Sequence, residues 1–179
     1  MTRTSKLAYL SGMLDTGGFI GQDDGVIHKI QYSVHTGNTT RKVCKFLVLH
    51  FGGVFIRVPD DEKKIYYWKL TGEKALPSLL KELYPFLFEK KDDAKYVIHK
   101  MDEFTEPSQA VKTRREIAAY QAGIIDATGI TDKITPHSED METNSERFLL
   151  SIIPYLVEKK KEVNDMLQSL RVCTETTIT

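Results

Sequence analysis

The chain has 179 residues, of which 41% are hydrophobic and 28% charged, and its 25 Lys and Arg residues balance 25 Asp and Glu residues. This composition predicts a compact domain or two small fused repeats, and no apolar run forms a secretory signal or reaches the ~20 residues of a membrane span, so we expect an intracellular protein without a membrane partner. The neutral net charge argues against a strong non-specific polyanion binder, but it is compatible with a local basic surface.

Helix and strand patterns alternate in the first part of the chain. Residues 7–17 have large apolar side chains at helical spacing, and the glycines at the end of this segment stop the helix. Residues 25–36 are rich in β-branched side chains and predict a strand or hairpin arm. Thr40 and the two residues before it are suited to cap a second helix that runs to about His50.

A hairpin and two helices follow. Segments 54–58 and 64–70 are rich in strand-forming residues, and a Pro-Asp-Asp turn sequence lies between them. Residues 75–88 predict a helix bent or broken at Pro85, and residues 90–104 predict another. The predicted order is therefore helix, two strands, helix, two strands, helices.

The chain also contains an internal repeat. At an offset of 111 residues, LAYLSGMLDTGGFIG (7–21) matches AAYQAGIIDATGITD (118–132), and at an offset of 69 residues, LKELYPFLFEKK (80–91) matches LLSIIPYLVEKK (149–160). Two matches in the same order predict a duplication. The offsets of 111 and 69 differ by 42 residues, and the remaining segment 133–147 is polar and turn-like. The second copy therefore cannot supply a four-stranded sheet.

The 7–21 segment and the order of the elements resemble the LAGLIDADG homing endonucleases. Residues 1–104 resemble one complete repeat, 105–114 a linker, and 115–179 a truncated second repeat that packs on the first. The resemblance implies an α+β, pseudo-twofold fold with one complete αββαββα repeat and one degenerate, mostly helical repeat. It also implies a saddle of strands that binds long DNA sites, which the family cuts with the help of metal ions.

In the same family, the two motif helices pack together at the pseudo-twofold axis. Small residues at helical spacing allow two helix backbones to approach closely. Each motif helix of this chain has such a stripe, and we expect the two stripes to face each other. The predicted interface residues are Ala8, Ser11, Gly12 and Asp15 in the first helix, and Ala119, Ala122, Gly123 and Asp126 in the second.

The acid that holds the catalytic metal in the family precedes the final glycine of the motif. This chain has Gly17 and Thr128 at the two positions, and neither side chain is a carboxylate, the hard anionic ligand that a divalent ion needs. Candidate substitutes are Asp23, Asp24 and Asp132, although each also fits a turn or a solvated loop. The histidines and the two cysteines show no metal-ligand spacing. We therefore expect no catalytic residue, no metal and no cofactor, with Mg²⁺ only if a nuclease activity survives.

Residues 22–70 contain eight Lys and Arg residues against five acids, so the sheet region is mildly basic. In the register of the family, Phe55 and Arg57 share the open face of the sheet with Tyr67 and Lys69, while Val54, Ile56 and Val58 face the other way. Lys90 and Lys159 match basic residues that the family has beside the cleavage centre. The predicted DNA-binding residues are Lys29 (or His28), Gln31, His35, Phe55, Arg57, Tyr67, Lys69 and Lys90.

Four functions are compatible with these features. The first hypothesis is a protein derived from a homing endonuclease that binds double-stranded DNA without cleaving it. The second is an RNA binder that uses the same surface, and the third is a protein-interaction or scaffold module. The fourth is an active metal-dependent endonuclease with a relocated acid. Half a saddle predicts weak binding by a monomer. A dimer could restore two half-sheets, but the chain's own second motif helix already occupies the pairing surface, so we expect a monomer or a weak homo-oligomer.

Overall fold

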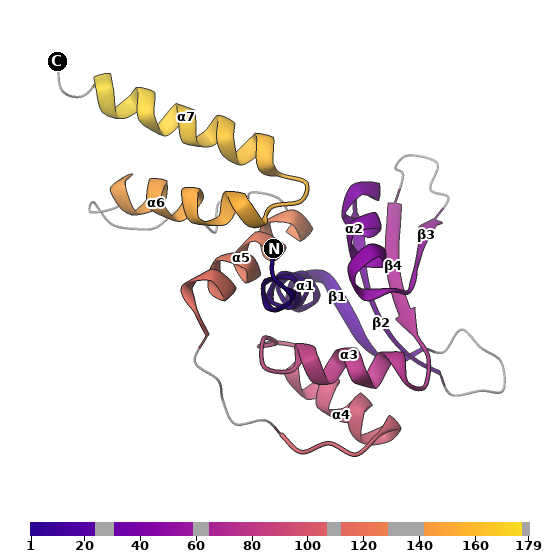
Figure 1. The fold of residues 1–179 in the computed structure, drawn as a ribbon. Coiled ribbons are helices and arrows are strands. Elements are labelled where there is room, and N and C mark those ends of the chain that lie inside the picture. Colours follow the sequence, from indigo (N-terminus) through magenta and orange to yellow (C-terminus); the bar gives the residue numbers. More distant parts are fainter. Residues whose placement is uncertain (24–30, 59–64, 107–111, 129–141, 177–179) are drawn as a thin grey trace.

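The computed structural model describes residues 1–23, 31–58, 65–106, 112–128 and 142–176 (Figure 1). Three of the predicted site residues, Asp24, Lys29 and Asp132, lie outside these ranges, as does His28. Gln31 begins a strand, but its side chain is not among those described. Within the described residues, no helix is both long and apolar enough to cross a membrane.

Among the described residues, the strands all lie between residues 18 and 71, where they alternate with helices as predicted. The elements of the first repeat are α1 (Arg3–Gly17), β1 (Gly18–Asp23), β2 (Gln31–Thr39), α2 (Arg41–Phe51), β3 (Val54–Val58), β4 (Ile65–Thr71), α3 (Ala75–Leu83) and α4 (Lys91–Met101). Thr40 caps α2 by accepting a hydrogen bond from the Val43 backbone N–H. Gly52 and Gly53 end the helix with φ of 75° and 79°, a conformation that side chains with a Cβ rarely adopt.

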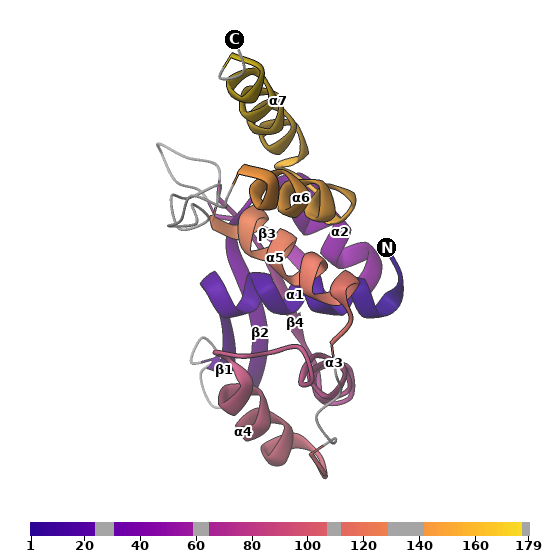
Figure 2. The ribbon, with the colours of Figure 1, turned by 90° about the vertical axis from the view of Figure 1, so that its left-hand side faces the viewer.

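The second repeat is helical throughout its described residues. It consists of α5 (Arg114–Thr128), α6 (Glu142–Ile152), a short 3₁₀ turn η2 (Ile153–Tyr155) and α7 (Lys160–Thr176). The prediction that residues 133–147 are turn-like is wrong at its end, because α6 begins at Glu142. Polar side chains there are compatible with a helix that is solvated on one side. In Figure 2, α7 extends away from the body of the molecule.

The four strands form an antiparallel sheet in the order β1-β2-β4-β3. One face of this sheet is buried: Ile20, Val34, Trp68 and Leu70 point into the core, where α1, α2 and α3 pack against the strands. Trp68 is fully buried, and its Nε1 donates a hydrogen bond to the Gly52 carbonyl at 2.8 Å. The helices described here therefore pack on one face of the sheet, and the opposite face is its open face as far as the described residues show.

Helices α1 and α5 cross at the centre of the molecule (Figures 1 and 2). A β-carbon added to Gly12 would lie 2.1 Å from the Tyr120 carbonyl oxygen, and one added to Gly123 would lie 2.0 Å from the Tyr9 carbonyl oxygen. Each backbone thus runs directly against the other, and the two glycines occupy equivalent positions in the two helices. The small residues Ala8, Ser11, Ala119 and Ala122 are buried along the same crossing.

Two aspartates tie this helix pair to the rest of each repeat. Asp15 accepts hydrogen bonds from the Phe88 and Lys90 backbone N–H groups, at 2.8 Å each, and from the Tyr120 hydroxyl at 2.8 Å.

Asp126 repeats this arrangement in the other half of the molecule. It accepts hydrogen bonds from the Val157 and Lys159 N–H groups, at 2.7 and 2.8 Å, and from the Tyr9 hydroxyl at 2.7 Å. The first aspartate and its tyrosine partner match the second pair at the offset of 111, and the backbone donors match at the offset of 69. Both sequence offsets therefore correspond to one pseudo-twofold arrangement in space.

Candidate nucleic-acid interface

The open face of the sheet is the candidate interface, and its composition differs from the predicted one. The register pairs Phe55 with Trp68 and Arg57 with Tyr66, so Phe55 and Arg57 lie on the side of the buried Trp68. The prediction that they share a face with Tyr67 and Lys69 is therefore wrong. Directly paired residues of antiparallel strands point to the same side, which places Ile56 beside Tyr67 and Val54 beside Lys69.

A row of rings crosses this open face. The Phe19 ring on β1 lies 4.9 Å from the His35 ring on β2, and the His35 ring lies 6.3 Å from the Tyr67 ring on β4, measured between centroids. Burial, together with the nearby Lys69 ammonium, lowers the pKa of His35 below its usual value, and Asp23 opposes this shift. The imidazole is therefore mostly neutral at pH 7, with one nitrogen able to donate and the other able to accept a hydrogen bond.

Lys69 is the basic residue at the middle of the open face. Its ammonium forms an ion pair with Asp23 at the end of β1. Part of its charge is therefore already compensated, and a phosphate that approaches this face has to compete with the carboxylate of Asp23.

Exposed cations gather instead on α2, which the sequence prediction did not include. Arg41, Lys42 and Lys45 are exposed and have no ion pair with any residue in the described ranges. The helix has no acidic residue, and its first residue, Arg41, directly follows the N-cap Thr40. A run of cations without acids over residues 41–51 is visible in the sequence, so charge patterning along this helix was the signal for these residues.

The last residues of the two central helices, Gly17 and Thr128, are not acids. A β-carbon at Gly17 would meet no atom within 4 Å, and the exposed Thr128 donates its hydroxyl hydrogen bond to the Ile124 carbonyl at 2.8 Å. Asp23 stands at the far end of β1, and five steps along an extended strand place it about 16 Å from Gly18. No group of three or more His, Cys, Asp or Glu side chains in the described part of the chain could hold a metal ion.

Lys90 and Lys159 occupy equivalent places after the two Pro turns. Their backbone N–H groups are held by the two central aspartates, and their ammonium groups lie 3.5 Å from Asp93 and 2.9 Å from Glu162. Both ammonium groups thus have an acidic neighbour one helical turn further along, which holds them close to their own helix.

Comparison with known proteins identifies the fold. No protein-family model and no curated protein sequence matches the chain. Among solved structures, the homing endonuclease I-CvuI in complex with the I-CreI target aligns with a TM-score of 0.50 at 18% identity, and the alignment covers 84% of this chain and 96% of that one.

Two further structures give weaker alignments. I-CvuI in complex with its own target has a TM-score of 0.48 at 18% identity, over the same shares of the two chains. I-DmoI in complex with DNA has a TM-score of 0.41 at 14% identity, covering 84% of this chain and 73% of that one. The I-CvuI match at 0.50, with the mixed helices and four-stranded antiparallel sheet, confirms the predicted fold class: the chain has the LAGLIDADG homing-endonuclease fold.

Proposed function

We propose that this protein binds double-stranded DNA through the open face of its sheet and does not cleave it. The observation that carries the proposal is the combination of an uncovered four-stranded sheet face with two central helices whose bases lack a carboxylate. The I-CvuI structure with the same fold is a complex with a DNA target that is not cleaved. Such a fold therefore accommodates duplex DNA independently of cleavage.

The open face has the chemistry to contact base edges. The neutral His35 and the hydroxyl of Tyr67 can donate and accept hydrogen bonds, and the exposed Val54 and Ile56 can pack against thymine methyl groups. Phosphate contacts fix the position of a protein on a duplex, and they need cations. Arg41, Lys42 and Lys45 on α2 and Arg57 on β3 are exposed cations. They lie on the helix-covered side of β3 and β4, so they would reach phosphates of a duplex that extends around the edge of the sheet.

The absence of cleavage follows from the helix bases. Metal-assisted hydrolysis of a phosphodiester needs an ion held beside the phosphate, to activate water and to neutralise the leaving oxygen. Gly17 supplies no ligand, and Thr128 supplies a neutral hydroxyl that already bonds to its own helix. Asp23 pairs with Lys69 far along β1, which argues against its use as a substitute acid.

The proposal is tested by selecting duplexes from a random pool with the full chain, then measuring their binding by fluorescence anisotropy over a range of salt concentrations. We expect salt-dependent binding, and each lost phosphate contact should lower the slope of log K against log salt by about 0.9. Arg41→Ala/Lys42→Ala should reduce that slope. Lys160→Ala/Lys161→Ala, an exposed pair at the start of α7, is the matched control and should leave it unchanged.

Three outcomes decide between this function and its alternatives. Absence of any salt-dependent duplex binding refutes the proposal. Stronger competition by single-stranded or hairpin RNA than by duplex DNA favours the RNA-binding alternative. Cleavage of the bound duplex with Mg²⁺ or Mn²⁺, abolished by Asp23→Asn, Asp24→Asn or Asp132→Asn, establishes an active nuclease with a relocated acid.

A protein-interaction module is the second candidate, and a specific observation favours it. Val54 and Ile56 on the open face are 58% and 45% exposed, and Phe19 is 37% exposed. Exposed apolar groups on one face can mark a protein-binding surface. This candidate predicts that Ile56→Lys, which adds a cation to the open face, leaves duplex DNA unbound, whereas the DNA-binding proposal predicts tighter binding of the variant at low salt.

A further inference from the structure

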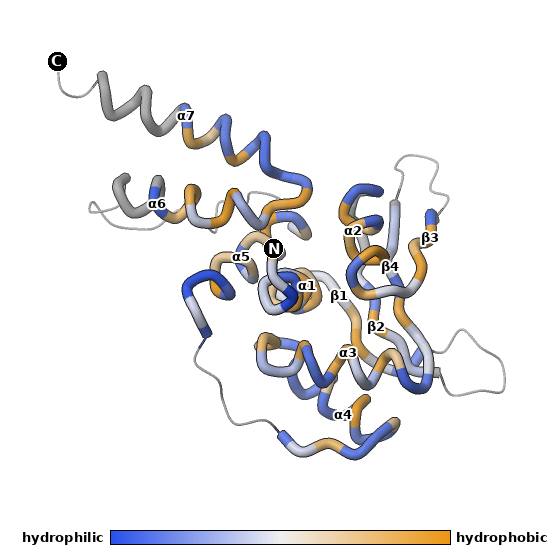
Figure 3. The backbone as a smooth tube through the Cα atoms, in the orientation of Figure 1, coloured by the Kyte–Doolittle hydropathy of each residue, from blue (hydrophilic) through white to orange (hydrophobic). Residues whose placement is uncertain are grey.

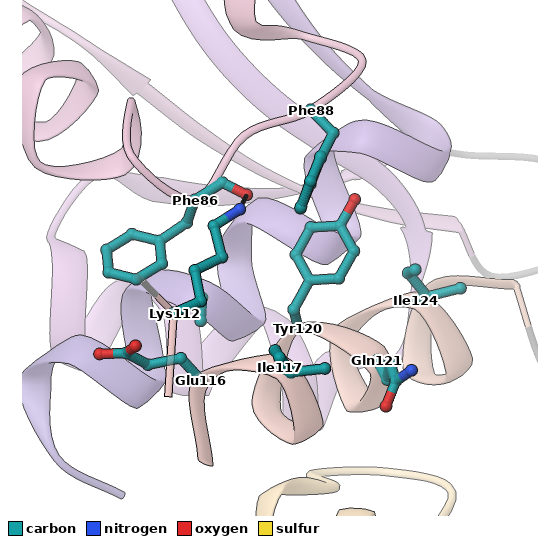
Figure 4. A pocket seen from close by; sticks show the side chains of 9 residues that line it. Phe86, Phe88, Lys112, Glu116, Ile117, Tyr120, Gln121 and Ile124 are labelled. Carbon is teal, nitrogen blue, oxygen red and sulfur yellow. Dashed lines mark hydrogen bonds between the residues drawn. The ribbon is translucent and has the colours of Figure 1, made fainter. Parts of the chain in front are cut away.

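The outer face of α5 borders a cavity of about 270 Å³ (Figure 4). Its apolar walls are Ala8 of α1, Phe86 and Phe88 of the turn before α4, and Ile117, Tyr120 and Ile124 of α5. Ile117 and Phe88 are 45% and 59% exposed, although both are large hydrophobic residues. This face of α5 is thus only partly covered by the described part of the chain.

The internal repeat shows what covers the same face in the other half of the molecule. At the offset of 111, the α5 residues Ile117, Tyr120 and Ile124 correspond to Lys6, Tyr9 and Met13 of α1. Tyr9 and Met13 are fully buried.

Helix α2 is one of the elements that cover α1 there. The Phe46 ring lies edge-on to the Tyr9 ring at 5.5 Å, and His50 Nδ1 lies 3.2 Å from Lys6 Nζ. If the pseudo-twofold relation is applied to α2, a helix at the equivalent position in the other half would lie on Ile117 and Tyr120. In the second repeat, α6, η2 and α7 are the elements described after α5, and none of them lines the cavity.

The walls of the two sites are chemically alike. At the offset of 69, Phe86 and Phe88 correspond to Tyr155 and Val157, and at the offset of 111, Ala8 corresponds to Ala119. One difference is informative: Gln121, which also lines the cavity, replaces the fully buried Leu10. A polar side chain at this position lowers the cost of leaving the face in water, so it suits a site that is occupied reversibly.

We propose that this cavity is the docking site for an amphipathic helix of a partner protein, which inserts an aromatic side chain next to Tyr120 as α2 inserts Phe46 next to Tyr9. Ile117, Tyr120 and Ile124 provide the i, i+3, i+7 ridge of a helix-in-groove contact, and Phe86 and Phe88 form the opposite wall. The proposal is independent of nucleic-acid binding, because the cavity contains no residue of the sheet.

The helix that the chain itself uses is the natural probe. A fluorescein-labelled peptide of residues 40–52, with Cys44→Ser to prevent oxidation, is titrated with the full-length protein and followed by anisotropy. An isolated helix of this length is only partly formed, so weak saturable binding is expected, with a Kd below about 1 mM. The same peptide with Phe46→Ala should bind at least about 10-fold more weakly, since burial of a phenyl ring is lost.

Two variants of the full-length protein locate the site. Ile117→Glu places a charge at the edge of the cavity and should abolish binding of the peptide. Leu150→Glu on α6 is the matched control, because Leu150 is 44% exposed, close to the 45% of Ile117, and does not line the cavity. Circular dichroism melting establishes that both variants are folded.

Three results would overturn the proposal. The first is the absence of saturable binding, and the second is binding that Ile117→Glu and Leu150→Glu weaken equally. The third is a concentration-dependent dimer in sedimentation velocity that Ile117→Glu dissociates, because the cavity would then be an interface between two copies of this chain.

Discussion

The close crossing of α1 and α5 gives the sharpest prediction, for Gly12→Ala. The new methyl group would lie 2.1 Å from the Tyr120 carbonyl oxygen, and real β-carbons keep at least 3.0 Å from such atoms. Both sides of the contact are helical backbone, so neither can move without its helix. Helices α1 and α5 must therefore move apart by roughly 1 Å along much of their crossing. At that separation, packed atoms lose a quarter to a half of their dispersion energy.

The magnitude follows from two opposing effects. Overpacking of a tight site costs about 1–3 kcal/mol or more, whereas replacing glycine by alanine inside a helix contributes up to ~1 kcal/mol of stability. We expect the free energy of unfolding to fall by about 2 kcal/mol and the Tm by roughly 4–8 °C for a chain of this size. Gly12→Leu should be worse, since its larger side chain meets the same carbonyl.

Urea denaturation followed by circular dichroism measures the effect, and two comparisons make it specific. Gly17→Ala is the control, because a methyl group there meets no atom within 4 Å, so its stability should equal or exceed that of the parent. Gly12→Ala/Gly123→Ala should lose less than the sum of the two single variants, because one separation of the helices accommodates both methyl groups. A Gly12→Ala protein within 0.5 kcal/mol of the parent, or additive losses, would refute the close crossing.

Three further predictions concern the central aspartates, the helix bases and the open face. Asp126→Asn turns an amide donor toward backbone N–H groups and should lower the free energy of unfolding by about 2–3 kcal/mol in urea titrations; an unchanged midpoint contradicts the network. Gly17→Asp/Thr128→Asp should create Mn²⁺ affinity, detectable by isothermal titration calorimetry, that the parent lacks; equal heats for both proteins would count against adjacent helix bases. His35 has a lowered pKa in the folded state, so the unfolded chain binds more protons and stability falls as the pH drops below about 6.5, the usual histidine value. His35→Gln should reduce this loss between pH 7 and 5, and identical profiles would show that His35 contributes nothing to it.

Much of the fold was predictable because its determinants are local or repeated. The Thr40 cap and the glycine pair that ends α2 are read directly from residue types, and each lies within one turn of the helix that it limits. The pairing of α1 with α5 is a long-range contact, yet duplication made it visible, since two copies of one stripe of small residues point to a shared axis. The fold could be predicted from the sequence because these local and repeated signals were both present.

The composition of the open face was not predictable from alternation alone. Figure 3 shows that most of β3 is hydrophobic. Alternation along residues 54–58 places three β-branched aliphatic residues on one side, and hydrophobicity assigns that side to the core. The structure does the opposite, because Trp68, the largest buried side chain, fixes which side of β4 faces the helices, and β3 takes its register from β4.

A tyrosine hydroxyl of each half bonds to an aspartate of the other half, and this has a consequence for how the chain can be divided. Tyr9 donates to Asp126 and Tyr120 donates to Asp15, so each half of the molecule takes one donor to its aspartate from the other half. Every donor to Asp15 comes from α5 or from the turn after α3, and none comes from a position that a second sheet would occupy. A fragment that ends before residue 112 would lack α5, and with it the Tyr120 donor to Asp15.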